Sequence, residues 1–387
     1  MGTMNELMNA ATVKSLAAQL RAAGAGELPH LAQAATDVDG LSLRGRTDVV
    51  ATALLADLPD DYREVASLYR RALAADSPGA SFGGWMIWPV SETVTTLALA
   101  ASAAPDGQEP RDASAFEDGL ALLAELTPRL TSEFAIRRFL EADLDRALAV
   151  VTTWTTHEDD RVRRLASEGT RPFLPWSIRV RSVLAHPEAA VPILDALHAD
   201  DSDFVRRSVA NHLNDLAREN PDLVVSIATE WSRDASAPGA DPEAAANTRW
   251  VVRHGLRTLV KKANPGALAL MGFAPATLEV TPLRVSPDVV TTPGSLTLEF
   301  EVTNVGPESV RLAIDYLVYY VKANGMLAPK VFKLATPTVA PGERVVLSKR
   351  HAFRPMTTRV HYAGAHSVEL QINGQRYGRA DFELALG

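Results

Sequence analysis

A repeated helical pattern before residue 273 constrains the fold more than any other feature of the chain. The triplet Val-Arg-Arg occurs at 162–164 and again at 205–207, 43 residues later, and a looser form follows at 252–254. The segment between the triplets is predicted to be a helix, an Asp-rich turn and a second helix. A period in the forties with two helices per unit is typical of HEAT-type repeats. Such units stack because none buries its apolar face alone, and the stack leaves an extended concave surface.

The composition changes abruptly near residue 277. Val, Thr, Phe and Tyr become frequent and alternate with polar residues, which is typical of strands. One face of 295–303 is expected to carry Leu296, Leu298, Phe300 and Val302. Asn373-Gly374 is a two-residue hairpin signal. We therefore predict a multidomain α + β protein: an α-helical HEAT-like-repeat solenoid over 1–273, followed by a small Ig-like β-sandwich over 277–387.

Several classes of protein are excluded by what the sequence lacks. The chain has no cysteine, so it has neither a disulfide framework nor a thiolate nucleophile. No phosphate-binding loop, dinucleotide fingerprint or HExxH motif occurs. The beginning of the sequence has no basic leader followed by an apolar region, and no apolar stretch is long enough to span a bilayer. We expect a cytoplasmic protein.

Charge is distributed unevenly along the chain. The net charge is −8, but residues 1–276 hold 27 Lys and Arg against 37 Asp and Glu, whereas 277–387 hold 12 against 10. Within 349–379 six cations face one acid, Glu369, and three histidines (His351, His361 and His366) lie in the same stretch. A local cluster of cations binds phosphate whatever the total charge. We hypothesise that this stretch grips a nucleic-acid backbone; a solvated strand face is the alternative.

The second helices of the repeats carry further cations. Arg207 and Asn211 lie on one stripe of the helix that contains Asp215, and a row at i, i+4 spacing with no acid among its members is formed by Arg249, Arg253, Arg257 and Lys261. Like charges at this spacing destabilise a helix by a few tenths of a kcal/mol per pair, roughly, so a phosphate backbone would offset the repulsion. A solvated basic face explains the same row equally well.

Two acids lie among arginines. Glu133 comes one turn before Arg137, and Asp215 three residues before Arg218. A carboxylate kept ionised beside DNA suits glycosidic cleavage, because the transition state is oxocarbenium-like. The residues alone nevertheless favour ordinary roles: a negative charge at a helix N-terminus for Glu133, and an i, i+3 ion pair for Asp215.

The segment RPFLPWS (171–177) interrupts the helical pattern. Pro172 and Pro175 predict a non-helical stretch that presents Trp176 just before the next helix. A tryptophan on a stiff loop can stack on a base or nucleoside. Spacing alone favours the alternative, in which Trp176 fills the seam between two repeats.

These motifs together resemble a known family. The repeats, TSEFAIRRFL (131–140), RPFLPWS and VRRSVANHLND (205–215) are similar to those of the alkylpurine DNA glycosylases built from HEAT-like repeats, in the AlkC branch with a C-terminal Ig-like domain. The resemblance implies excision of cationic alkylated bases from double-stranded DNA without base flipping and without metal or cofactor. We also expect a monomer, which is usual for enzymes that wrap a duplex. It implies that Glu133 and Asp215 are the catalytic carboxylates and that Trp176 contacts the lesion nucleoside.

Thirteen further residues are predicted to bind DNA: Arg137, Arg164, Arg171, Arg207, Asn211, Arg249, Arg253, Arg257, Lys261, Lys349, Arg350, Arg354 and Arg359. Two other functions are compatible with the same repeats. One is a HEAT-repeat scaffold that binds protein and catalyses nothing, and the other is a DNA-binding repair accessory protein without catalysis.

Overall fold

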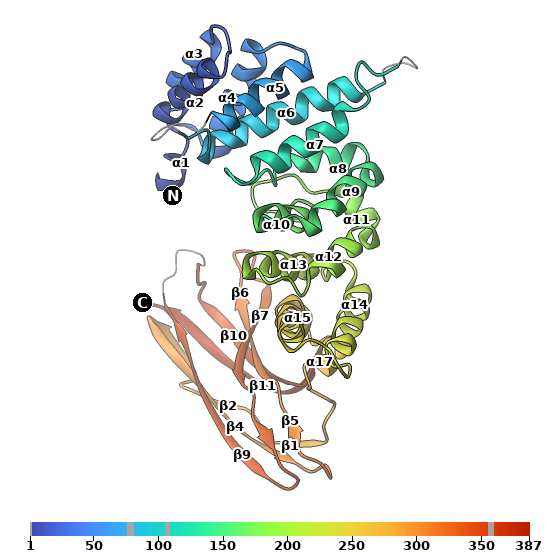
Figure 1. Cartoon of the computed structure of the whole chain (residues 1–387). Helices are drawn as coiled ribbons and strands as arrows, with labels where there is room; N and C mark the ends of the chain where they lie inside the picture. The colour runs from blue at the N-terminus through green and yellow to red at the C-terminus, as the bar shows by residue number, and fades with distance from the viewer. Residues whose placement is uncertain (1, 76–80, 105–108, 355–359) are drawn as a thin grey trace. The chain divides into compact units, whose positions relative to one another are not determined.

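The computed structural model describes residues 2–75, 81–104, 109–354 and 360–387. The chain forms two compact units, one of residues 1–224 with 230–255 and one of 225–229 with 256–387. Helices make up the first, and the second holds all of the β-strands among the described residues (Figure 1). The predicted fold class, helical repeats followed by an Ig-like domain, is confirmed.

All regular secondary structure among the described residues of the first unit is helical. Its helices are α1 (Gly2–Asn5), α2 (Ala10–Ala22), α3 (Pro29–Asp37), α4 (Leu43–Asp57), α5 (Tyr62–Ala74), α6 (Ile87–Ser102), α7 (Ala115–Leu126), α8 (Ile136–Ala142), α9 (Leu144–Thr153), α10 (Asp160–Gly169), α11 (Arg181–Ala185), α12 (Val191–Leu197), α13 (Asp203–Leu216), most of α14 (Pro221–Asp234) and α15 (Pro242–Gly255). Side chains that accept backbone N–H groups begin several of them, including Ser42 for α4 and Asp143 for α9. Such caps stabilise a helix by about 1 kcal/mol each.

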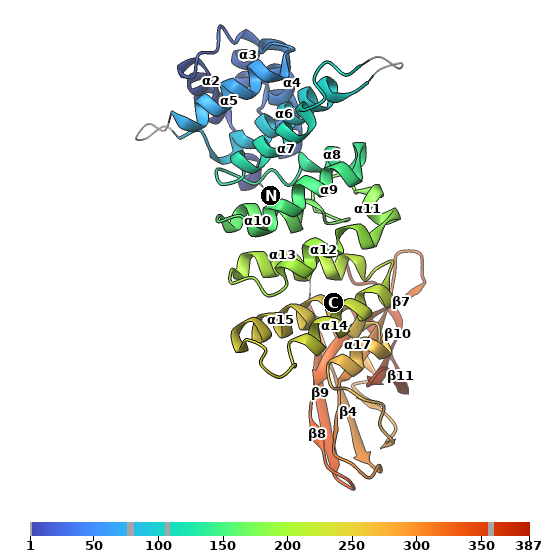
Figure 2. The same ribbon diagram turned by 45° about the vertical axis from the view of Figure 1, so that its right-hand side comes forward.

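The repeat predicted from the Val-Arg-Arg triplets is seen in the helices. Helices α10 and α13 begin 43 residues apart, and α13 packs against both α10 and α15 (Figure 2). The residues of α13 expected to face the core, Val205, Val209 and Leu213, are all buried. A Cβ atom on Gly255 would lie 2.7 Å from Cδ2 of Leu213, so only glycine permits this approach of α15 to α13. Helices α10, α13 and α15 are therefore stacked in chain order.

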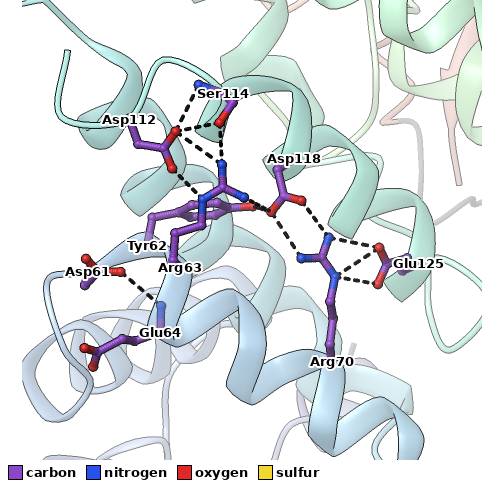
Figure 3. A network of polar contacts seen from close by, with 9 residues as sticks. All are labelled: Asp61, Tyr62, Arg63, Glu64, Arg70, Asp112, Ser114, Asp118 and Glu125. Atoms are coloured by element: carbon purple, nitrogen blue, oxygen red, sulfur yellow. Dashed lines mark hydrogen bonds and ion pairs between the residues drawn. The ribbon is translucent and has the colours of Figure 1, made fainter. Parts of the chain in front are cut away.

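Helices α5 and α7 are joined by a network of ion pairs that Figure 3 shows. Arg63 contacts Asp112 at 2.5 Å, Arg70 contacts Asp118 at 3.1 Å and Glu125 at 3.0 Å, and the hydroxyl of Tyr62 donates to Asp118. The arginine side chains are 49% and 35% exposed. Pairs this open to water stabilise a fold by about 0–1 kcal/mol each, so we interpret the network as structural.

The second unit is a β-sandwich with two short helices, α16 (Arg257–Lys261) and α17 (Pro265–Leu270). One sheet has the order β1-β4-β2 with β9 also pairing β4, the other has the order β3-β11-β10-β6-β7, and β5 pairs β8. The strands are β1 (Leu278–Val280), β2 (Arg284–Ser286), β3 (Val289–Thr292), β4 (Gly294–Asn304), β5 (Val310–Arg311), β6 (Ile314–Val321), β7 (Leu327–Ala335), β8 (Thr338–Val339), β9 (Arg344–Phe353), β10 (Gly364–Ile372) and β11 (Gln375–Leu386).

Two local predictions for the sandwich are confirmed. The alternating face of β4 is buried in the core between the sheets together with residues of β6 and β10. Ile372 pairs with Gln375 across the Asn373-Gly374 turn, and both turn residues have positive φ (45° and 85°). Two successive left-handed residues match the type I′ turn that suits the twist of a hairpin.

The boundary between the two units lies before the change in composition. Helix α17 contributes Leu268 to an apolar cluster with Phe273 and Ala313, so both short helices belong with the strands. The proposed limits, 1–273 and 277–387, divide the chain by its type of secondary structure and remain a prediction. Among the described residues, no helix combines the length and the apolar character needed to cross a membrane.

Candidate active site

Five residues of the first unit form a continuous series of ion pairs, which we call the ion-pair chain: Glu133, Arg164, Glu168, Arg171 and Asp215. They come from three places. Glu133 lies in the turn before α8, Arg164 and Glu168 lie on α10 with Arg171 just after it, and Asp215 lies in the last turn of α13. The packing of α10 against α13 places the second and third groups side by side.

Acid and base alternate along the ion-pair chain. Oε2 of Glu133 lies 2.7 Å from Nη1 of Arg164, whose Nη2 lies 3.5 Å from Oε1 of Glu168. The same Glu168 oxygen accepts a hydrogen bond of 2.5 Å from Nη1 of Arg171. Arg171 then donates from Nε to Oδ2 of Asp215 at 2.9 Å, and its Nη2 forms an ion pair with the same oxygen at 2.8 Å. The two carboxylates predicted to be catalytic are thus joined through two guanidinium groups and one further acid.

The ion-pair chain is more buried than the network of ion pairs between α5 and α7. The side chains of Arg164 and Arg171 are 16% and 11% exposed, and Asp215 is 3% exposed. An ion pair this far from water is costly to desolvate and is retained only when every charge finds a partner. Loss of one member leaves the next charge buried and unpaired, so the groups form one electrostatic unit.

Glu168 is the member that the sequence analysis missed. Both of its carboxylate oxygens are engaged, because Ser208 of α13 donates to Oε2 at 2.7 Å while Oε1 faces the arginines. The spacing could have found it, since Glu168 follows Arg164 by four residues and precedes Arg171 by three. Glu168 thus contacts both guanidinium groups that pair with Glu133 and Asp215.

The partner of Glu133 differs from the one expected. Sequence spacing suggested Arg137, but the ion pair is made with Arg164 on the neighbouring helix. Thr131 also donates its hydroxyl to Oε2 of Glu133 at 3.0 Å. Within the part of the chain that the structure describes, no hydrogen bond to the other oxygen, Oε1, is formed. That oxygen can therefore accept from a water molecule or a ligand.

Asp215 has two arginine partners, because Arg218 also lies 3.3 Å from Oδ1. Burial nevertheless raises the pKa of the Asp215 carboxyl above its ordinary value, although Arg171 and Arg218 oppose the shift. The expectation that a neighbouring arginine alone sets its protonation is thus incomplete. For Arg171, burial is the largest single influence and lowers the pKa, but Glu168 and Asp215 together raise it above the ordinary value.

A neutral histidine is buried between α10 and α13, close to the ion-pair chain. His212 is fully buried one turn before Asp215, and its Nδ1 lies 3.1 Å from the carbonyl oxygen of Ser167. Because a carbonyl only accepts, Nδ1 carries the proton. Burial, with the charge of nearby Arg171, lowers the pKa of His212 to about 3, so the ring adds no charge at neutral pH. Its Nε2 is buried without a hydrogen-bond partner among the described residues.

Trp176 does not fill a seam between repeats; the alternative that spacing favoured is wrong. The residue lies between α10 and α11 in a stretch without regular structure, as the prolines predicted, and it is 61% exposed. Its backbone is left-handed, with φ of 65°. For a bulky side chain this conformation costs about 1–3 kcal/mol and is typical of functional sites.

The loop that carries Trp176, residues 171–178, is fastened to the ion-pair chain. We call it the Trp176 loop. Its first residue, Arg171, bonds Asp215 as described, and its Phe173 ring lies under the guanidinium of Arg218 at 4.6 Å. Arg218 in turn pairs with Asp215. Trp176 is therefore held on a segment that contacts the Asp215 environment twice.

Arg137 is not placed where it could bind phosphate. Its side chain is fully buried, and it donates hydrogen bonds to four backbone carbonyl groups around the Trp176 loop. The prediction that Arg137 contacts DNA therefore disagrees with its burial, because a side chain without exposed surface cannot reach a phosphate group.

The other predicted contacts of the first unit divide into two kinds. Arg164 and Arg171 are committed to the carboxylates, and Arg164 also lies 4.6 Å from the centre of the Phe204 ring. Arg207, Arg249 and Arg253 are exposed, although Arg207 pairs with Asp203 at 2.8 Å, and Asn211 is half-buried. The three exposed arginines are accessible to a polyanion such as DNA.

The row predicted at 249–261 is divided by the structure. Helix α15 ends at Gly255 and α16 begins at Arg257, so Arg249 and Arg253 lie on one helix and Arg257 and Lys261 on the next. Glycine is a poor residue for a helix interior, which accounts for the break. The expectation of one uninterrupted helical row is wrong.

In the second unit, strand alternation separates two of the predicted cations. Lys349 and Arg350 are neighbours on β9, so their side chains leave opposite faces. Arg350 and Arg354 are exposed, and Arg359 lies outside the described residues. His351 and His366 are buried rather than displayed; His351 lies within 2.9 Å of the hydroxyls of Tyr316 and Tyr320. The described residues contain no group of three or more His, Asp or Glu arranged to hold a metal ion.

These features define a helical-repeat protein with a buried carboxylate–guanidinium site and a C-terminal Ig-like domain. Residues 130–259 match the family "DNA alkylation repair enzyme", and residues 279–386 match "Uncharacterised protein YhaZ, C-terminal Ig-like domain". The first match spans Glu133, the Trp176 loop and Asp215.

Two relatives are similar over nearly the whole chain. A Bacillus subtilis (strain 168) protein, "Uncharacterized protein YhaZ", is 32% identical over 345 residues, which cover 89% of this chain and 88% of the relative. A solved structure, the Pseudomonas fluorescens alkylpurine DNA glycosylase AlkC bound to DNA containing an abasic site analog, is 35% identical. It matches with a TM-score of 0.76 over 98% of this chain and 99% of its own. The chain belongs to the AlkC-like alkylpurine DNA glycosylase family, with the C-terminal Ig-like domain.

The left-handed backbone of Trp176 predicts an unusual order of stability. Trp176→Gly should have a free energy of unfolding about 1 kcal/mol higher than Trp176→Ala, because glycine adopts positive φ without a steric penalty. Urea denaturation of both variants measures the difference. At Arg179, an exposed residue without positive φ, the order should reverse and alanine should be the more stable. Equal stability of the glycine and alanine variants at 176 would contradict the strained conformation.

Proposed function

We propose that this protein is a DNA glycosylase of base excision repair that hydrolyses the N-glycosidic bond of cationic N-alkylated bases. Its substrates are 3-methylcytosine, 1-methyladenine and 3-methyladenine in double-stranded DNA, and it acts as a monomer in the cytoplasm. The observation that carries the proposal is the pair of carboxylates, Glu133 and Asp215, held by guanidinium groups beside an exposed tryptophan.

The chemistry of the substrate explains why two carboxylates suffice. A base with a formal positive charge leaves as a neutral molecule, so no general acid has to protonate it. The sugar left behind resembles an oxocarbenium ion, which a nearby anion stabilises. Oε1 of Glu133 accepts no hydrogen bond from the described residues, so one carboxylate oxygen remains for the attacking water. We therefore assign the two acids to stabilisation of the sugar and positioning of water.

Trp176 is assigned to the lesion nucleoside. Its indole is exposed on a loop that is fastened beside Asp215, and its backbone conformation is one that a protein retains for function rather than packing. Stacking of a base on an aromatic ring contributes about 1–3 kcal/mol. A fixed, exposed ring could recognise the lesion without a deep pocket, in keeping with excision without base flipping.

One experiment separates the proposal from a protein scaffold and from an accessory protein without catalysis. The full-length protein is incubated with a duplex that contains 3-methylcytosine or 3-methyladenine, and alkali-labile abasic sites are then counted. Strand breaks after alkali are expected. Binding without abasic sites would indicate the accessory protein, and neither binding nor abasic sites would indicate the scaffold.

The carboxylates are tested in the same assay. Glu133→Gln and Asp215→Asn should each lower the single-turnover excision rate by about a hundredfold or more, because the neutral amide no longer stabilises the developing cation. Affinity for a duplex with an abasic analogue should change little. Glu219→Gln, which removes an exposed carboxylate four residues after Asp215, is the control and should excise normally. Wild-type rates in both site variants would refute the assignment.

We further propose that the Ig-like domain binds the phosphate backbone through its exposed cations. Arg350 and Arg354 lie on and just after β9 and are open to solvent. The backbone grip hypothesised for 349–379 thus rests on these two, because the Lys349 side chain leaves the other face of the strand. The α16 cations Arg257 and Lys261 extend the set of proposed contacts.

Salt dependence measures the binding of these cations to phosphate. Removal of one phosphate-binding cation should lower the slope of log K against log salt by about 0.9, so Arg350→Ala combined with Arg354→Ala should flatten it by nearly two. Arg344→Ala is the matched control, because Arg344 is also on β9 but pairs with Glu301. If the double variant kept the wild-type slope, the domain would not grip DNA through this surface.

A further inference from the structure

Arg137 is a buried cation whose partners are all neutral. Its Nε donates to the carbonyl oxygen of Ile178 at 2.7 Å, and its Nη1 donates to those of Arg171 at 2.7 Å and Gly169 at 3.3 Å. Its Nη2 donates to the carbonyl oxygen of Pro172 at 3.2 Å. No carboxylate of the described residues is paired with it, in contrast to Arg164 and Arg171.

Burial of a charged guanidinium without a carboxylate partner costs free energy, so its hydrogen bonds must offset that cost. Burial lowers the pKa of Arg137 to about 10, although Glu133, Glu168 and Asp215 oppose the shift. The guanidinium is therefore still charged at neutral pH, and an apolar side chain of similar size would be cheaper to bury. The hydrogen bonds that Arg137 donates to carbonyl groups account for an arginine at this position, whereas the stability of α8 does not require one.

The four carbonyl groups bracket Trp176. Three of them precede it and the fourth, that of Ile178, follows it. Pro172 and Pro175 keep this stretch from forming a helix, so its backbone carbonyls need partners from elsewhere. A planar guanidinium with five donors fixed in space is the one side chain that can meet several of them at once. The same side chain thus pins the loop on both sides of Trp176.

We propose that Arg137 is a positioning residue that fixes Trp176 in its exposed, left-handed conformation. It touches no part of the substrate and acts through the Trp176 loop. The effect on excision rests on the function proposed above, whereas the effect on the loop does not. Gly169 supports the arrangement, because a Cβ there would lie 2.7 Å from Cγ2 of Ile136, and only glycine lets the end of α10 come this close to α8.

A double-mutant cycle tests the proposal. Arg137→Met keeps a flexible, unbranched side chain and removes all donors, and it should lower the single-turnover excision rate by at least about tenfold, as a small displacement of a positioning group does. In a Trp176→Ala background the same change should have less than about a twofold effect, because the residue it positions is gone. If the two losses multiply instead, Arg137 acts independently of Trp176 and the proposal is overturned.

A second readout does not depend on activity. Amide hydrogen exchange of residues 171–178 should accelerate in Arg137→Met, while exchange in α13 stays unchanged. Unchanged exchange in the loop would also overturn the proposal. If the wild-type protein excised no alkylated base, the proposed function would fail, but this measurement would still decide the role of Arg137.

Two further variants guard against a folding defect. Arg137→Lys keeps the charge but presents its donors from a single point, so it should loosen the loop while preserving the fold. It decides the question if the methionine variant does not fold. Arg138→Met is the control, because Arg138 is the adjacent residue and bonds Thr96 rather than the loop. It should leave both excision and loop exchange at wild-type values.

Discussion

The alternation of acid and base from Glu133 to Asp215 is the constraint on which the site depends. The two carboxylates come from different helical segments and would repel each other if the space between them held no cations. Arg164 and Arg171 supply those cations, and Glu168 holds the two arginines together. Because these groups are largely buried, a charge that loses its partner is costly to leave unpaired. The geometry of either carboxylate is therefore set by the whole series and not by its nearest neighbour alone.

Arginine serves three purposes within a small part of the first unit. Arg164 and Arg171 neutralise and orient the carboxylates, Arg137 satisfies the backbone of the Trp176 loop, and exposed arginines such as Arg207 are open to a polyanion. All three uses exploit a fixed fan of donors that lysine lacks. The chain belongs to the AlkC-like alkylpurine DNA glycosylase family, which gives these arginines a common context.

The sequence predicted the fold well because the evidence for it is periodic. Helices α10 and α13 begin 43 residues apart, and apolar residues recur at every second position of β4. Each pattern is carried by several residues, so a single exception does not obscure it. The burial of Arg137 could not be predicted, because its partners are backbone carbonyls that leave no trace in residue type. The exposure of Trp176 is equally hidden, since tryptophan is usually buried and a positive φ is rare for so large a residue. Glu168 could have been predicted as a site residue, because its spacing to Arg164 and Arg171 is visible in the sequence.

The most direct test of this account asks whether the two carboxylates act as one unit. Single-turnover excision is measured for Glu133→Gln, for Asp215→Asn and for the protein that carries both changes. If the ion-pair chain couples them, the double variant should be within about tenfold of the slower single variant, as for groups that catalyse together. A double variant whose loss equals the product of the two single losses would show that Glu133 and Asp215 work independently, and would contradict the central claim.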